Sequence, residues 1–65
     1  MLNNRIVVCR AEKGWTQQDL GERVGASRQT IASMERNKYN PSLALCIELA
    51  KALKADLNSL FWEGD

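Results

Sequence analysis

Apolar residues recur along the chain at intervals of three and four positions, the spacing of one face of an α-helix. No stretch alternates apolar and polar residues with the period of two that marks a half-buried strand. Helix-start signals support this reading: Thr16 is followed three residues later by Asp19, a capping-box pattern, and Ser27 precedes another apolar stretch. The pattern predicts five helices, at about 4–13, 16–24, 28–35, 42–53 and, after Asp56, 57–61.

The segments between these helices contain typical helix-ending residues. Asn3 is the expected N-cap of the first helix, and Gly14 is its expected stop. Gly25 can take the positive φ of a residue just past a helix end, and Pro41 keeps Asn40 out of the helical region. Short connections between five short helices predict a compact all-α domain.

Residues 16 to about 35 place one helix before another across the three-residue turn 25–27. This is the helix-turn-helix arrangement, in which the second helix enters the major groove of DNA. Gly21 would let the two helices approach closely, and Leu20, Val24 and Ile31 would set the angle between them. The outward side of the second helix carries four polar or basic residues and no acid: Arg28, Gln29, Thr30 and Ser33.

These motifs resemble the Cro/cI-type, or XRE-family, helix-turn-helix regulators over nearly the whole chain. The matching positions are Arg10, 14–21, 25–31, Glu35 and 40–43. Gly21 and Cys9 stand where the family more often has Ala and Leu, which is expected to cost helix propensity and packing rather than function. The resemblance implies a five-helix lambda-repressor-like domain that binds double-stranded DNA as a dimer on a two-fold operator.

The resemblance also implies roles for individual residues. Arg10 and Glu35 would form an ion pair between the first and third helices. Base edges would be contacted by Arg28, Gln29, Thr30 and Ser33, and phosphates by Gln17, Arg36, Asn37, Lys38 and Tyr39. The chemistry agrees, because Arg can bind guanine O6/N7 and Gln can bind adenine N6/N7 in bidentate fashion, while helix N-termini offer free N–H groups to phosphate.

Composition limits the other possibilities. The 65 residues, 45% hydrophobic and 26% charged, predict one folded domain over residues 1–65. The net charge is only +1, but residues 1–38 contain seven basic and four acidic residues, which permits a nucleic acid partner. The chain lacks histidine and has two cysteines, which excludes His-based acid–base catalysis and a Cys₂His₂ zinc site. We therefore expect no enzyme, no metal site and no cofactor.

Surplus apolar residues in the C-terminal third predict a homodimer through some of Leu45, Leu57, Phe61 and Trp62, with residues 55–65 as a dimerisation tail. Residues 62–65 are expected to be frayed. A repressor is the favoured function, and an antitoxin-like module whose main partner is another protein is the alternative. Steep weakening of binding with salt would favour DNA over an apolar protein interface.

The expected location is the cytoplasm. No apolar run approaches the roughly 20 residues of a membrane span, and the N-terminal residues lack the apolar core of a signal peptide.

Overall fold

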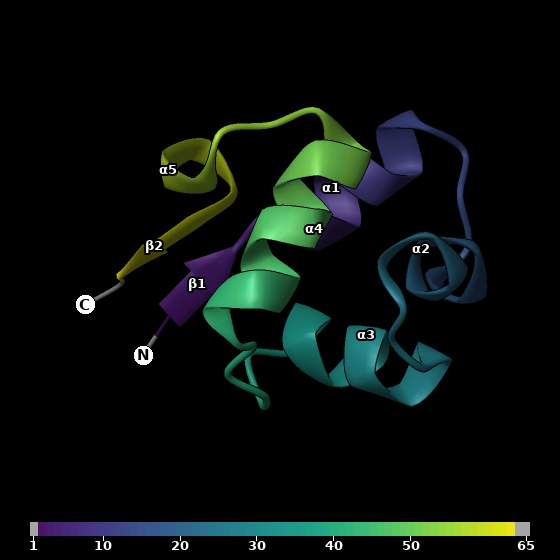
Figure 1. Cartoon of the computed structure of the whole chain (residues 1–65), viewed down its shortest axis with the longest axis horizontal. Coiled ribbons are helices and arrows are strands. Elements are labelled where there is room, and N and C mark those ends of the chain that lie inside the picture. Colours follow the sequence, from purple (N-terminus) through teal and green to yellow (C-terminus); the bar gives the residue numbers. More distant parts are fainter. Residues whose placement is uncertain (1, 64–65) are drawn as a thin grey trace.

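In the computed structural model, which describes residues 2–63, five helices pack around one core and two short strands bring the chain ends together (Figure 1). The five predicted helices are confirmed, and the strand pair is a minor addition to a helical domain. The elements in chain order are β1 (Leu2–Asn4), α1 (Ile6–Glu12), α2 (Gln17–Val24), α3 (Arg28–Glu35), α4 (Leu43–Leu53), α5 (Leu57–Leu60) and β2 (Phe61–Glu63).

The two central helices begin at their predicted capping residues. Thr16 Oγ1 accepts from the Asp19 N–H at 3.0 Å, and the Asp19 carboxylate accepts from the Thr16 N–H at 2.9 Å. Ser27 Oγ accepts from the Thr30 N–H at 3.1 Å, which starts α3. Gly25, with φ of 74°, ends α2 in the left-handed conformation that glycine adopts without strain. Local chemistry therefore defines both helices of the helix-turn-helix.

The turn brings α2 and α3 closer than most side chains at position 21 would permit. A Cβ atom added to Gly21 would lie 2.5 Å from the carbonyl oxygen of Ala26. The expectation that Gly21 lets the helices approach closely is confirmed, and the expectation that it costs packing is wrong, because its missing side chain is what allows the approach.

The first helix begins two residues later than predicted. Asn3 is not its N-cap but lies in β1, which pairs antiparallel with β2 so that Asn3 is opposite Trp62 and Asn4 is opposite Phe61. Arg5 occupies the N-cap position without a side-chain capping bond. The prediction of a frayed tail is wrong for residues 62 and 63, which form β2, while residues 64–65 lie outside the described part. A three-residue strand has too few positions to show alternation.

The core combines one apolar face from each helix. Its enclosed side chains are Ile6, Leu20, Ile31, Met34, Leu49 and Leu60. On α4 the buried positions are Cys46, Leu49 and Leu53, whereas Leu43 is 71% exposed and Ile47 37% exposed. The side of α4 that points away from the core therefore carries exposed apolar residues beside the charged Glu48 and Lys51. Within residues 2–63, no helix has the length and apolar character needed to cross a membrane.

Candidate nucleic-acid interface

The outward side of α3 presents the predicted base-contacting residues at two depths. Arg28 and Gln29, at its N-terminal end, are exposed, whereas Thr30 and Ser33 are half-buried. The Thr30 hydroxyl lies 2.9 Å from Ser27 Oγ and so already has a partner within the first turn. Arg28 and Gln29 are therefore the side chains best placed to reach a base edge.

The loop after α3 has a defined backbone. The Lys38 N–H donates to the Ser33 carbonyl at 2.8 Å and the Asn37 N–H donates to the Met34 carbonyl at 3.0 Å, which together form a Schellman motif. Asn37 occupies the left-handed position with φ of 59°, a conformation that asparagine tolerates better than most residues. The loop therefore leaves α3 along one fixed path.

The side chains predicted to contact phosphates from this loop differ in exposure and in the hydrogen bonds they already make. Arg36, Lys38 and Tyr39 are exposed. The Asn37 side chain is instead used within the protein, where it accepts from Asn4 Nδ2 at 3.0 Å and donates to Asn3 Oδ1 at 3.4 Å. Asn37 already uses its side chain and its backbone N–H within the protein, so it has fewer donors to offer a phosphate than Arg36, Lys38 and Tyr39.

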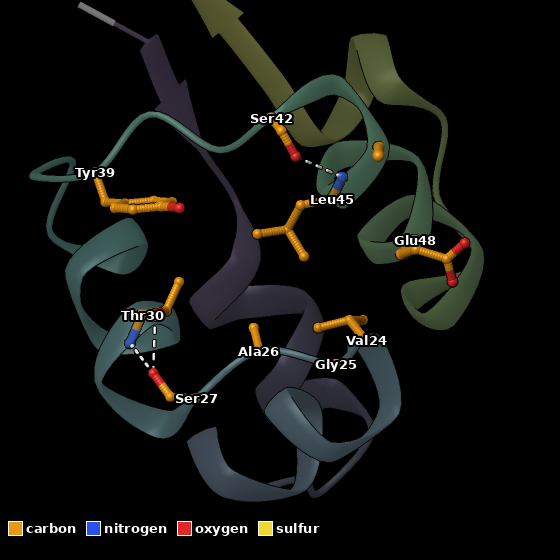
Figure 2. A pocket seen from close by; sticks show the side chains of 10 residues that line it. Val24, Gly25, Ala26, Ser27, Thr30, Tyr39, Ser42, Leu45 and Glu48 are labelled. Atoms are coloured by element: carbon orange, nitrogen blue, oxygen red, sulfur yellow. Dashed lines mark hydrogen bonds between the residues drawn. The ribbon is translucent and has the colours of Figure 1, made fainter.

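A groove of about 440 Å³ lies between the turn, the start of α3 and the start of α4 (Figure 2). Ser27 and Ser42, the N-caps of α3 and α4, both line it, so the positive ends of two helix dipoles flank it. The Tyr39 hydroxyl adds a donor, the Thr30 hydroxyl is already paired with Ser27 Oγ, and Glu48 is the acid among the lining residues. Two helix N-termini and several hydroxyls make a suitable approach for a sugar-phosphate backbone.

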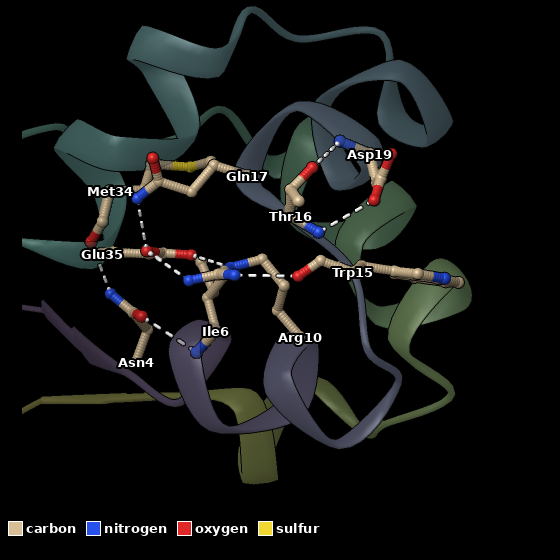
Figure 3. A network of polar contacts seen from close by, with 9 residues as sticks. All are labelled: Asn4, Ile6, Arg10, Trp15, Thr16, Gln17, Asp19, Met34 and Glu35. Atoms are coloured by element: carbon tan, nitrogen blue, oxygen red, sulfur yellow. Dashed lines mark hydrogen bonds and ion pairs between the residues drawn. The ribbon is translucent and has the colours of Figure 1, made fainter.

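A polar network behind α3 joins three helices (Figure 3). Arg10 of α1 pairs with Glu35 of α3 at 2.7 Å, and their side chains are 18% and 6% exposed. Gln17 of α2 donates from Nε2 to Glu35 Oε1 at 2.9 Å. Gln17, a predicted phosphate contact, is therefore half-buried and braced against Glu35 at the start of α2.

The same pair determines the charge that α3 presents. Glu35 is the acid of this helix, and its carboxylate is turned inward and matched by Arg10. The exposed charges at the two ends of α3 are then those of Arg28 and Arg36. This distribution favours a polyanion on that side.

Two of the four predicted dimer residues have substantial exposed surface. Leu57 and Trp62 are 37% and 42% exposed, whereas Leu45 and Phe61 are half-buried and pack against the core. The sequence reading missed the exposed pair Leu43 and Ile47, which lie one turn apart on α4. Their i, i+4 spacing does not by itself distinguish an exposed apolar pair from a buried one.

The Ile47 side of α4 continues into α5. A shallow groove is lined by Ile47, Ala50, Lys51, Lys54, Ala55, Asp56 and Leu57.

Among the described residues, no group of three or more His, Cys, Asp or Glu side chains is arranged to hold a metal ion.

The fold and the exposed side of α3 define a helix-turn-helix DNA-binding domain. The helix-turn-helix family model matches residues 8–60, and the chain belongs to this family, among the XRE-type transcriptional regulators. It is accordingly a non-enzymatic DNA-binding regulator. The HTH-type transcriptional regulator YgzD of Bacillus subtilis, itself uncharacterized, is 39% identical over 61 residues, which span 94% of this chain and 92% of that protein.

A solved structure shows the same fold. A candidate DNA-binding protein from Bacteroides fragilis superimposes with a TM-score of 0.83 at 39% identity, covering 95% of this chain and 100% of that one. Two more distant relatives have named functions. An immunity repressor of Bacillus phage phi105 is 36% identical over 95% of this chain and 43% of its own length, and the antitoxin HipB of Escherichia coli is 30% identical over 86% and 60%.

Proposed function

We propose that the protein is a transcriptional repressor that binds a two-fold DNA operator as a homodimer and acts by occupancy. The observation that carries this proposal is the exposed pair Arg28 and Gln29 at the start of α3, a helix whose acid, Glu35, is matched by Arg10. A helix in the major groove with these side chains at its N-terminal end can read guanine and adenine edges.

Base and phosphate contacts are divided between the helix and its flanks. Arg28 and Gln29 contact base edges, with Ser33 and Thr30 closer to the helix surface. Lys38, Arg36 and Tyr39 contact phosphates from the loop, Asn37 fixes the turn that presents them, and Gln17 contributes from the start of α2. The groove between the N-termini of α3 and α4 supports this division, because its N–H groups and hydroxyls suit a phosphate.

Dimerisation in this proposal uses the exposed apolar side of α4 and α5. Ile47 and Leu57 line one groove, and Leu43 lies one turn before Ile47. The proposed interface keeps Leu57 and Trp62 from the predicted set and adds Leu43 and Ile47. Leu45 and Phe61 pack against the core beneath it. A symmetric dimer would present two α3 helices to two half-sites.

Repression is supported by the likeness to the phage immunity repressor, and action on DNA is consistent with a cytoplasmic location. The likeness to HipB supports the alternative, in which a partner protein is also bound.

Selection of bound duplexes from a random DNA pool tests the proposal. A palindromic consensus whose affinity falls steeply with salt is the expected result. Failure to enrich any sequence would contradict it and favour a protein-binding module.

A further inference from the structure

We infer that Asn4 is a positioning residue for the DNA-contacting loop 36–39, and that the terminal strands hold it in place for this role. The inference rests on the proposed function, because it concerns a residue behind the loop rather than one that touches DNA. Neither the composition nor the helix-turn-helix motif singles out Asn4, which lies more than 30 positions from the loop in sequence.

The Asn4 side chain uses both its donor and its acceptor side to join three segments. Its Nδ2 donates to the Met34 carbonyl at 2.7 Å and to Asn37 Oδ1 at 3.0 Å. Its Oδ1 accepts from the Ile6 N–H at 3.1 Å, at the start of α1. Figure 3 shows Asn4 between Ile6 and Met34. One amide thereby ties the N-terminus of α1 to the last turn of α3 and to the loop.

The bonds to Met34 and Asn37 fall on the Schellman motif itself. The Met34 carbonyl accepts from both the Asn37 N–H and Asn4 Nδ2. Asn37 is the residue of this loop with a positive φ. Its side-chain bond to Asn4 therefore holds the position at which the chain turns away from the axis of α3. Lys38 follows directly, and the path of its side chain toward a phosphate depends on this turn.

The backbone of Asn4 is held by the sheet. Asn4 lies opposite Phe61 in the β1–β2 pair, and Phe61 packs against the core. Asn3, its neighbour in β1, accepts from Asn37 Nδ2 at 3.4 Å and adds a second link to the loop. The strands at the chain ends therefore support the loop on the DNA side of the molecule.

The test compares Asn4→Ala and Asn37→Gly with the parent chain, using a consensus duplex and a scrambled one at several salt concentrations. Asn37→Gly keeps the positive φ and removes the bond to Asn4. Both variants should lose about threefold to tenfold in affinity per protomer on both duplexes, the size of one hydrogen bond from the displaced loop to a phosphate. The salt slope, meaning the slope of the logarithm of affinity against the logarithm of salt concentration, should become less steep in both variants. The change should be about one unit per protomer, as for one lost phosphate contact. The order of base preference should stay unchanged.

A structural readout and a control separate positioning from general stability. Amide exchange of the Lys38 N–H, in the loop, should accelerate in Asn4→Ala relative to the amides within α3. The control is Ile6→Val, which removes one core methyl group, costs about 0.5–1.5 kcal/mol of stability, and keeps every Asn4 hydrogen bond. It should leave the salt slope of the folded protein unchanged.

The outcomes are distinguishable. If the parent chain binds neither duplex, the proposed function fails and takes this inference with it. If the parent binds and Asn4→Ala matches it in affinity and salt slope, this inference alone is overturned. Equal losses in Ile6→Val and Asn4→Ala would also overturn it, because the effect would then follow stability rather than the loop.

Discussion

Arg10 and Glu35 form a two-point ion pair between α1 and α3: Nε donates to Oε2 at 2.7 Å and Nη2 donates to Oε1 at 3.3 Å. Arg10 Nη1 also donates to the Trp15 carbonyl at 2.8 Å, in the segment between α1 and α2. Gln17 of α2 is bound to the same carboxylate. One pair of charges therefore fixes α3, the recognition helix of the helix-turn-helix, relative to α1 and α2.

Arg10→Ala should therefore destabilise the domain strongly. The substitution leaves Glu35, 6% exposed, without its cationic partner, and breaking such a buried pair costs about 3–5 kcal/mol. We expect the thermal midpoint to fall by at least about 10 °C, since 1 kcal/mol corresponds to about 4–8 °C in a domain of this size. Glu12→Ala, an exposed acid on the same helix, is the control and should change little. An unchanged midpoint for Arg10→Ala would show that the pair contributes nothing to stability.

Lys54→Gly should stabilise the protein. Lys54 ends α4 with φ of 54°, where a side chain is strained and glycine is favoured. The expected gain is about 0.5–1 kcal/mol in chemical denaturation. Lys51→Gly removes the same charge from the helix interior and should lose about 1 kcal/mol. Changes of the same sign in both variants would contradict this account of the helix end.

The helices could be predicted because their signals are local. Thr16 with Asp19, Ser27 and Gly25 act within one turn, and the structure uses each of them where the sequence predicts it. Pairing of β1 with β2 joins opposite ends of the chain and leaves no local signal in three residues. The start of α1 was misplaced for the same reason.

The site could be predicted less completely, because exposure depends on tertiary packing. Spacing alone could not distinguish the buried Leu49 face of α4 from the exposed Leu43 and Ile47 face, since apolar residues occupy both. The roles of Asn4 and Asn37 depend on contacts between distant segments. The pairing of Arg10 with Glu35 could be predicted, because it follows from the resemblance to a known family and from the place of each charge beside the inward face of its helix.

The capping box predicts one contribution to the pH dependence of stability. Hydrogen bonds from the Thr16 backbone N–H, and then from its side chain, hold the pKa of Asp19 below the usual aspartate value. The unfolded chain therefore takes up a proton at Asp19 before the folded one does as pH falls, so this stabilisation is full above the usual aspartate pKa and is lost below it. Asp19→Asn should abolish that part of the acid sensitivity, measured as unfolding free energy against pH. A parallel pH profile for the two proteins would contradict it.

The proposed dimer surface predicts that Ile47→Lys shifts the protein toward monomer in sedimentation equilibrium. A charge at the groove shared with Leu57 would have to be desolvated in the interface. Val8→Lys, at a 54% exposed position on α1, is the control and should remain dimeric. A chain truncated after Leu60, which removes Phe61 and Trp62, should also dimerise less tightly. Full dimerisation of Ile47→Lys would place the interface elsewhere.

Arg28 and Lys38 should differ in the kind of binding they support. Arg28 is exposed at the start of α3 and is assigned to a base edge, so Arg28→Ala should cost about 1–3 kcal/mol per half-site on the consensus duplex and flatten the preference at one position. Lys38 is exposed in the loop after α3 and is assigned to a phosphate. Lys38→Ala should weaken consensus and scrambled duplexes about equally and lower the salt slope by about one unit per protomer.

The ratio of consensus to scrambled affinity in Arg28→Ala, measured against the parent and Lys38→Ala across a salt series, tests the central claim that α3 reads DNA sequence. The ratio should fall by about 5-fold to 150-fold per half-site in Arg28→Ala, the equivalent of about 1–3 kcal/mol, and stay at the parent value in Lys38→Ala. If Arg28→Ala weakened both duplexes equally and kept the parent ratio, α3 would not read bases through Arg28 and the recognition-helix assignment would be wrong.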